Sequence, residues 1–151
     1  MTRLLIVIMS ISCIVFFSCD KNDTNHVGDT DLVIKAGFIC GWGTGTDSIE
    51  ITNKTIKYVY YIPSESKNPK IFKTRSVTSS EWAEIINVVN MNDFVKLYYQ
   101  TCNVCFDGCD EWIFIKSNAI SHDIRFTKGL KIDSINKLQT KLEQLRIEFN
   151  Q

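Results

Sequence analysis

The sequence predicts an α+β domain in which a mainly antiparallel sheet carries two helices on one face. Three observations support this fold class. β-prone runs joined by turn residues occupy residues 32–61 and 111–126, a capped amphipathic segment follows Thr78, and a second amphipathic segment free of Gly and Pro begins near Ile132. In chain order these segments give an N-terminal strand, a hairpin, a helix, a second hairpin and a second helix, so the predicted sheet consists of two hairpins plus one strand.

Residues 1–18 have the pattern of a signal peptide. Arg3 provides a positive start, and the run from Leu4 to Phe17 is almost continuously apolar but, at about fourteen residues, shorter than a membrane-spanning helix. The segment ends in "VFFSC", which closes on Ser18 and Cys19. It resembles the lipobox of bacterial lipoproteins, in which the cysteine becomes the lipidated first residue of the mature chain. An ordinary cleaved secretory signal and an uncleaved membrane anchor are the alternatives, and both also export the domain.

Cys19 and the polar stretch "DKNDTNHVGDTD" form a predicted tether, residues 19–31, because the stretch contains too little apolar surface to fold. Signal, tether and small domain together resemble the small lipoproteins of Bacteroides-like bacteria. The resemblance implies a palmitate-bearing Cys19 and a protein held by its lipid in the membrane of the cell envelope, on the periplasmic or the surface face. Residues 32–151 are then expected to form a single α+β domain.

The charge balance bears on the choice of partner. The chain has 17 basic and 17 acidic side chains, and removal of residues 1–18 takes away only Arg3. Nucleic-acid binders usually carry a marked basic excess, so no nucleic-acid partner is expected. A local basic excess lies between Lys54 and Arg75, where Glu65 is the only acidic residue, and we interpret it as a solvated face.

The first predicted strand, "LVIKAGFIC", runs into the glycine-rich loop "GWGTGTD" at residues 41–47. A nucleotide-binding glycine loop opens a helix, whereas a β-prone run follows here, so the loop is predicted to be a turn. Trp42 on this loop is a possible contact for a sugar or protein partner. The alternative is that its ring packs against the core.

The first hairpin is predicted over residues 48–62, with its turn at Asn53 and Lys54. Its apolar residues alternate as one buried face requires: Ile49, Ile51, Ile56, Tyr58 and Tyr60. Ile71 and Phe72 indicate the start of a further short strand.

A capping box from Thr78 to Glu81 predicts a helix start, with the Thr78 hydroxyl accepting from the backbone and Glu81 reaching back. The apolar residues behind it recur at helical spacing: Trp82, Ile85, Ile86 and Val89. The C-terminal helix is predicted with Asp133 or Ser134 near its cap, and a coiled-coil seam is the alternative use of its stripe. That stripe consists of Ile132, Ile135, Leu138, Leu142, Leu145 and Phe149.

The second hairpin is predicted within "EWIFIKSNAISHDIRF", with its turn at Ser117 and Asn118. Trp112 and Phe114 alternate on the first strand, and Ile120, Ile124 and Phe126 lie on the return, with the facing register left open. Trp112 is a second possible partner contact.

Four cysteines remain once Cys13 is cleaved off and Cys19 is lipidated: Cys40, Cys102, Cys105 and Cys109. An even number in an exported chain indicates two disulfides. The spacing favours Cys102 with Cys105 and Cys40 with Cys109, and Cys40 with Cys102 or Cys105 is the rival arrangement.

Two other uses of the cysteine cluster "TCNVCFDGCDEW" are possible. Cys102 and Cys105 form a C-x-x-C motif, but Gly108 and a strand follow, whereas a reactive thiol of this kind sits at a helix N-terminus. The four cysteines can in principle hold zinc, and Asp107, Asp110 and Glu111 a hard cation, but neither knuckle spacing nor a calcium loop is present. No metal and no cofactor are therefore predicted.

No catalytic constellation accompanies the cysteines. The chain has no Gly-x-Ser-x-Gly elbow, His26 lies in the tether, and His122 lies in a predicted strand. The tripeptide Asp-Ser-Ile, at residues 47–49 and 133–135, resembles the O-glycosylation sequon of exported Bacteroidota proteins and implies Ser48 and Ser134 as acceptors.

The sequence therefore predicts a lipid-anchored, non-enzymatic envelope domain that is stabilised by disulfides and binds a protein or glycan partner. The alternative is a thiol-disulfide oxidoreductase or a metal-binding protein that uses Cys102, Cys105 and Cys109.

Overall fold

The computed structural model describes residues 31–65, 67, 69–118 and 120–151. The predicted signal peptide, Cys19 and the tether up to residue 30 lie outside these residues. The strands are β1 (Val33–Cys40), β2 (Thr46–Ile51), β3 (Thr55–Tyr61), β4 (Ile71–Ser76), β5 (Cys109–Lys116) and β6 (Ser121–Thr127). The helices are α2 (Ser79–Asn87), α3 (Met91–Phe94) and α4 (Asn136–Glu148), with short 3-10 turns η1 (Gly41–Gly43), η2 (Asn103–Phe106) and η3 (Asp133–Ile135).

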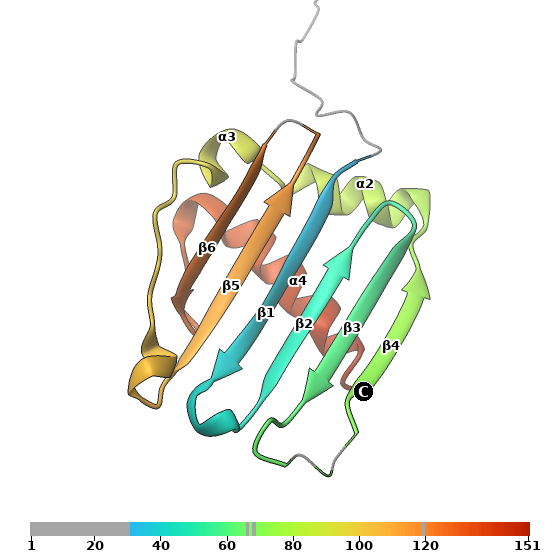
Figure 1. Cartoon of the computed structure of the whole chain (residues 1–151). Coiled ribbons are helices and arrows are strands. Elements are labelled where there is room, and N and C mark those ends of the chain that lie inside the picture. The colour runs from blue at the N-terminus through green and yellow to red at the C-terminus, as the bar shows by residue number, and fades with distance from the viewer. Residues whose placement is uncertain (1–30, 66, 68, 119) are drawn as a thin grey trace, which may run out of the picture.

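The six strands form one antiparallel sheet in the order β4-β3-β2-β1-β5-β6 (Figure 1). The α+β class and the antiparallel sheet agree with the prediction. The sheet has six strands: the five of the N-terminal strand and the two hairpins, and the short strand that Ile71 and Phe72 indicated. The additional strand is β4, which pairs with β3 and extends the meander from β1 to β4. The chain then crosses behind the sheet through α2 and α3, and the β5–β6 hairpin adds to the free side of β1.

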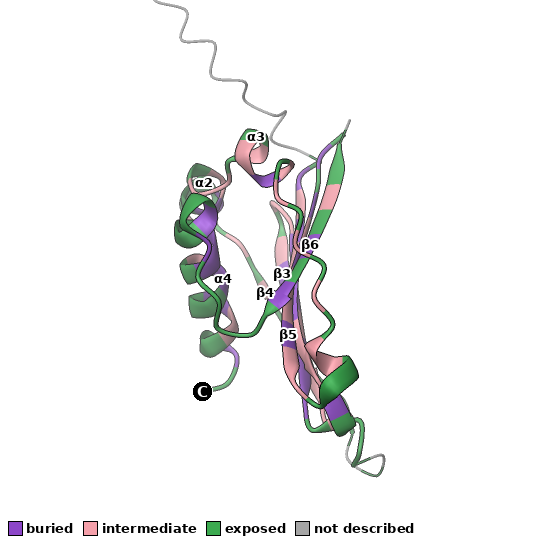
Figure 2. Ribbon diagram, turned by 90° about the vertical axis from the view of Figure 1, so that its left-hand side faces the viewer, coloured by how far each residue is buried: buried purple, intermediate pink, exposed green. Residues whose placement is uncertain are grey.

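Helices α2 and α4 lie on the same face of the sheet, and the other face is open (Figure 2). Alternation along each strand directs one set of side chains toward these helices. The predicted alternation of the first hairpin is confirmed for Ile49, Ile51, Ile56 and Tyr58, which are all buried. The six predicted positions of the C-terminal stripe are buried as well, which agrees with a helix covering the sheet and not with a coiled-coil seam.

The helix starts differ in how they are capped. Thr78 caps α2 as predicted, because its Oγ1 accepts from the backbone N–H of Glu81 at 3.2 Å. The Glu81 carboxylate interacts with the backbone of Thr78 and is also held by both guanidinium nitrogens of Arg75. Neither Asp133 nor Ser134 caps α4 through its side chain, since the 3-10 turn η3 precedes that helix.

The second hairpin turns at Ser117 as predicted, with its N–H bonded to the Ile120 carbonyl at 2.8 Å. The core side of β5 consists of Ile113 and Ile115, which are buried, whereas Trp112 lies on the open face. Ile113 pairs with Ile124 and Glu111 with Phe126. The alternation predicted for Trp112 and Phe114 is therefore wrong, because these residues face the side of the sheet that no helix covers. On the return strand Ile124 and Phe126 are buried, whereas Ile120 precedes β6 and is 50% exposed. Trp112 stays half-exposed because no helix covers its side of the sheet.

In the described part of the chain, no helix combines the length and the apolarity needed to span a membrane.

Candidate functional site

Three connections meet at the end of the sheet where β1 finishes: the η1 turn, the η2 turn and the loop between β3 and β4 (Figure 1). We call this the loop end. β1 enters the sheet from the opposite end. Two disulfides, a buried carboxylate and two exposed aromatic rings are located at the loop end.

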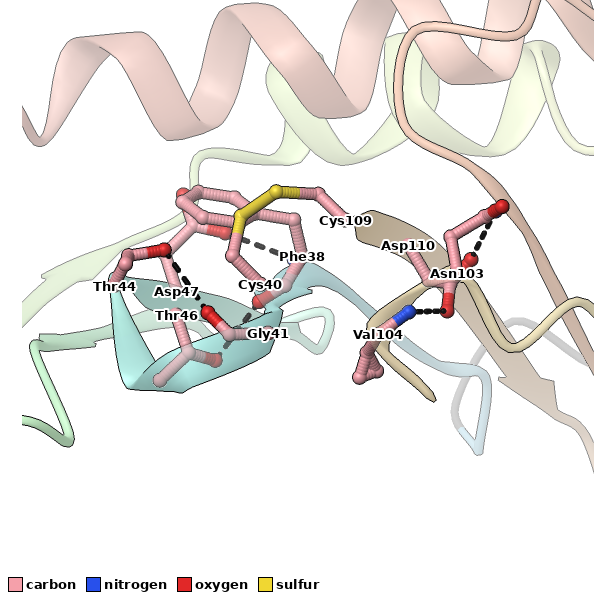
Figure 3. Close-up of a disulfide and its surroundings, with 10 residues drawn as sticks. All are labelled: Phe38, Cys40, Gly41, Thr44, Thr46, Asp47, Asn103, Val104, Cys109 and Asp110. Atoms are coloured by element: carbon pink, nitrogen blue, oxygen red, sulfur yellow. Dashed lines mark hydrogen bonds between the residues drawn. A yellow bond between two sulfur atoms is a disulfide. The ribbon is translucent and has the colours of Figure 1, made fainter. Parts of the chain in front are cut away.

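The disulfide Cys40–Cys109 joins the last residue of β1 to the first residue of β5 (Figure 3). The two cysteines are direct partners in the antiparallel ladder, with their Cα atoms 4.0 Å apart. The second disulfide joins Cys102 to Cys105 across the start of η2. This is the pairing that the spacing favours.

Asp110, next to Cys109, lies on the face of β5 that no helix covers. Its carboxylate is nevertheless fully buried, because the η2 segment folds over it. Its Oδ1 accepts from Thr101 Oγ1 at 2.8 Å and from Asn103 Nδ2 at 2.7 Å, and its Oδ2 accepts from the Val104 N–H at 3.2 Å. Burial by itself raises the pKa of Asp110, but these hydrogen bonds outweigh it, and the pKa is lowered overall. Asp110 therefore holds the η2 turn against the sheet as a charged hydrogen-bond acceptor.

The loops are also joined to one another. The Gly41 N–H donates to the Gly108 carbonyl at 2.8 Å, and Ser64 donates its backbone N–H and its hydroxyl to the Gly43 carbonyl at 3.0 and 2.9 Å. A Cβ at Gly41 would lie 2.8 Å from the Cα of Asp107, so only glycine allows this approach. The η1 turn is thus fixed between the η2 turn and the β3–β4 loop.

Two large rings project from this frame into solvent. Trp42 in η1 is 78% exposed, and Phe106 at the end of η2 is 88% exposed. Trp42 has a left-handed backbone (φ 56°), and so does Asp107 (φ 65°). Because the Trp42 ring is exposed, the alternative that it packs on the core is wrong.

Polar side chains around the two rings are already engaged in the fold. Thr44 Oγ1 donates to the Gly41 carbonyl, Ser64 Oγ to the Gly43 carbonyl, and Asn103 Nδ2 to both Asp110 and Thr127. The hydrogen-bond donors of these three side chains are therefore used within the fold, while their oxygen atoms can still accept, and Asp107 is an exposed carboxylate next to Phe106 in the sequence.

The acidic residues considered for a cation are not brought together. Asp110 faces the open side beneath η2, whereas Glu111, as the next residue of the strand, faces the helices and lies 3.3 Å from Arg146. Asp107 is exposed on η2. Among the described residues, no group of three or more His, Cys, Asp or Glu side chains is placed to hold a metal ion.

The C-x-x-C motif lacks the device that activates a redox cysteine. Cys102 precedes a 3-10 turn of only four residues, which ends at the left-handed Asp107. In the part of the chain that the structure describes, no α-helix begins at Cys102, so the motif lacks the helix N-terminus that activates a thioredoxin-like thiol.

Exposure nevertheless separates the two disulfides. Both Cys102 and Cys105 are exposed, whereas Cys40 and Cys109 are half-buried in a paired ladder. Graded dithiothreitol is therefore expected to reduce Cys102–Cys105 at about tenfold lower concentration, because the attacking thiolate must reach a sulfur atom. Alkylation followed by peptide mass spectrometry measures this order, and simultaneous reduction of both bonds would contradict it.

A second polar cluster lies at the same end of the sheet, beneath α4. The Arg146 side chain is 3.6 Å from Asp47 and 3.3 Å from Glu111, and Lys128 Nζ stands 3.7 Å above the ring of Phe38. Burial raises the pKa of Asp47, opposed by Arg146, the Phe38 N–H and Lys128. The cleft beside Arg146 has room for about one water molecule, so we assign this cluster to the attachment of α4 and not to a substrate.

The remaining predicted site residues are dispersed. Trp112 and Ser48 lie on the open face, both paired with Gly37, and Ser134 is exposed in η3. Glycosylation at Ser48 and Ser134 stays a prediction. His122 Nε2 donates to the Leu97 carbonyl at 2.8 Å and its ring lies edge-on to Phe94, which is a packing role.

No protein-family model matches this chain, and no curated protein matches it either.

Phe106 and Asp110 were not singled out by the sequence as an exposed ring and a buried anchor. Phe106 lies directly between Cys105 and the turn-forming residues Asp107 and Gly108. Its place in a turn, outside any strand or helix, is the sequence feature that could have indicated an exposed ring.

Proposed function

We propose that this protein is a lipid-anchored, non-enzymatic domain of the bacterial envelope, and that it binds a protein partner through Trp42 and Phe106. The observation that carries the proposal is the exposure of both rings on loops that are joined by hydrogen bonds and disulfides. Rigid aromatic anchors lose little conformational entropy on binding and dominate the energetics of many interfaces.

A protein partner is favoured over a glycan by the polar groups around the rings. A sugar requires both hydrogen-bond donors and acceptors beside the aromatic face, and the donors of Thr44, Ser64 and Asn103 are used in internal hydrogen bonds. An apolar pocket on a protein makes no such demand, because it buries the rings and excludes water.

The position of the loop end fits an anchored protein. With a lipid on Cys19, the chain reaches β1 at the end of the sheet opposite to η1. The eight residues of β1 span about 26 Å, so η1 lies about that far along the sheet from the point at which β1 begins.

Trp42→Ala and Phe106→Ala are each expected to weaken partner binding by about tenfold or more. Both rings are exposed, so the free energy of unfolding is expected to change by less than about 0.5 kcal/mol. A photoreactive residue at position 42 identifies the partner by cross-linking in cells, and titration of the purified partner gives the affinities.

Tyr98→Ala is the matched control, because Tyr98 is also 88% exposed but lies on the segment between α3 and η2, beside His122. Its affinity is expected to equal that of the wild type. Equal binding by all variants would remove the loop end as the site, and Trp42-dependent binding to a purified glycan would replace the protein partner with a carbohydrate.

A further inference from the structure

β4 is an edge strand whose outer side is unpaired within the described part of the chain. It lies at one end of the strand order, and no backbone hydrogen bond joins its outer side to another described segment. The opposite edge is different, because Arg125 of β6 exchanges backbone hydrogen bonds with Tyr99 and Thr101 at 2.8 and 3.0 Å. One edge of the sheet is therefore covered and the other is available for pairing (Figure 1).

The side chains of β4 alternate between two environments. Phe72 and Thr74 project from the open face, whereas Ile71, Lys73 and Arg75 share the helix-covered face with Tyr58 and Ile56 of β3. Phe72 is 70% exposed and Ile71 is 45% exposed. The unpaired backbone N–H and C=O groups of an edge strand can pair with another chain, and here two apolar side chains lie exposed beside them.

Charge decides which kind of strand fits. Arg75 is neutralised by Glu81 and Glu148. Lys70 stacks on the Tyr61 ring and Lys73 donates to the Phe149 carbonyl, and neither has a carboxylate partner among the described residues. Pairing with β4 of a second copy would place lysines beside lysines, which is unfavourable across a strand pair.

We propose that β4 binds an extended segment of another protein as a seventh strand, and that this segment alternates acidic and apolar residues. Backbone hydrogen bonds to the free edge supply affinity, and the two faces supply specificity. An apolar side chain on the open face lies beside Phe72, while an acidic side chain on the other face lies beside Lys73. The inference goes beyond the proposed function, since it uses a surface separate from Trp42 and Phe106.

The probe is a capped seven-residue peptide that alternates glutamate and valine, added to the purified protein. Titration calorimetry is expected to give a measurable Kd, and hydrogen exchange is expected to show slower exchange for amides of β4. A peptide of the same composition with its valines and glutamates in separate blocks is expected to bind about tenfold more weakly, because only alternation matches both faces.

Two changes test the backbone and the charge separately. N-methylation of every second peptide residue removes the donors that face β4 in one register, and it is expected to abolish binding. Lys73→Glu is expected to weaken binding by about tenfold, while Lys137→Glu, the same change on an exposed residue of α4, leaves the Kd within about twofold. Phe72→Ser provides a second variant that removes only an exposed ring.

The outcomes separate the possibilities. Binding that requires the unmethylated backbone, Lys73 and alternation supports the inference. Binding that is indifferent to N-methylation overturns it, and so does a concentration-dependent dimer that competes with the peptide, because a second copy is then the occupant. Trp42→Ala is expected to leave peptide binding unchanged, so failure here and failure of the proposed function are distinguishable.

Discussion

Replacing Cys40 and Cys109 together by serine is expected to lower the free energy of unfolding by about 4 kcal/mol. The disulfide closes a loop between residues 69 apart in the sequence, and a cross-link of that span removes much of the conformational freedom of the unfolded chain. It also joins the neighbouring strands β1 and β5 at the loop end, where the N-terminal meander meets the second hairpin. Urea denaturation of the wild type and the variant measures the loss.

The matched control is the Cys102→Ser, Cys105→Ser double variant. Its disulfide spans only 3 positions, so the same chain-entropy relation gives about 2 kcal/mol. The ratio of the two losses therefore tests the physical reason. Equal losses would mean that native packing around the sulfur atoms, and not the length of the closed loop, determines the contribution of each bond.

The elements with a strong hydrophobic period were predictable. Leu138, Leu142 and Leu145 recur at helical spacing, and each is buried against the sheet. The first hairpin was equally clear, because Ile49 and Ile51 alternate with polar residues on a sheet that has one covered face. β4 carries no such signal: no residue of this strand is fully buried, and the strand exists because β3 offers it a paired edge.

The candidate site was predictable only where one residue type carried the information. Cysteine count and spacing favoured the two disulfides, and the glycine loop identified Trp42 as a ring on a turn. Asp110 was considered only as a possible cation ligand, because its burial arises only when Thr101 and Asn103 fold over the open face of β5. This contact forms only in the folded structure, so the local sequence pattern around Asp110 does not predict it.

Cys109 and Asp110 together explain why the η2 turn is fixed. As consecutive strand residues they point to opposite faces, so Cys109 is tied to β1 on the helix side and Asp110 binds η2 on the open side. Phe106 is held in solvent between these two anchors. Loss of the carboxylate should therefore release η2 while the disulfide Cys40–Cys109 remains intact.

Asp110→Asn is expected to lower the free energy of unfolding by about 3 kcal/mol. The amide group keeps the size of the side chain, but one oxygen acceptor becomes an N–H donor that faces Asn103 and Thr101 or the Val104 N–H. A buried donor is then left without a partner. Asp107→Asn is the matched control, since that exposed residue tolerates the same change in its left-handed backbone, with an expected loss below about 0.5 kcal/mol.

The stability difference between the wild type and Asp110→Asn is expected to depend on pH in a definite direction. Because the pKa of Asp110 is lowered in the folded protein, its stabilisation is complete above the ordinary aspartate pKa of about 3.9 and is lost as the pH falls through the folded value. The stability gap between wild type and Asp110→Asn is therefore expected to shrink as the pH falls below about 4. Asp47, whose raised pKa acts in the opposite direction, is present in both proteins and cancels in the difference. A gap that stays constant down to pH 2 would show that Asp110 is held without its charge, and that the hydrogen bonds to η2 do not depend on a carboxylate.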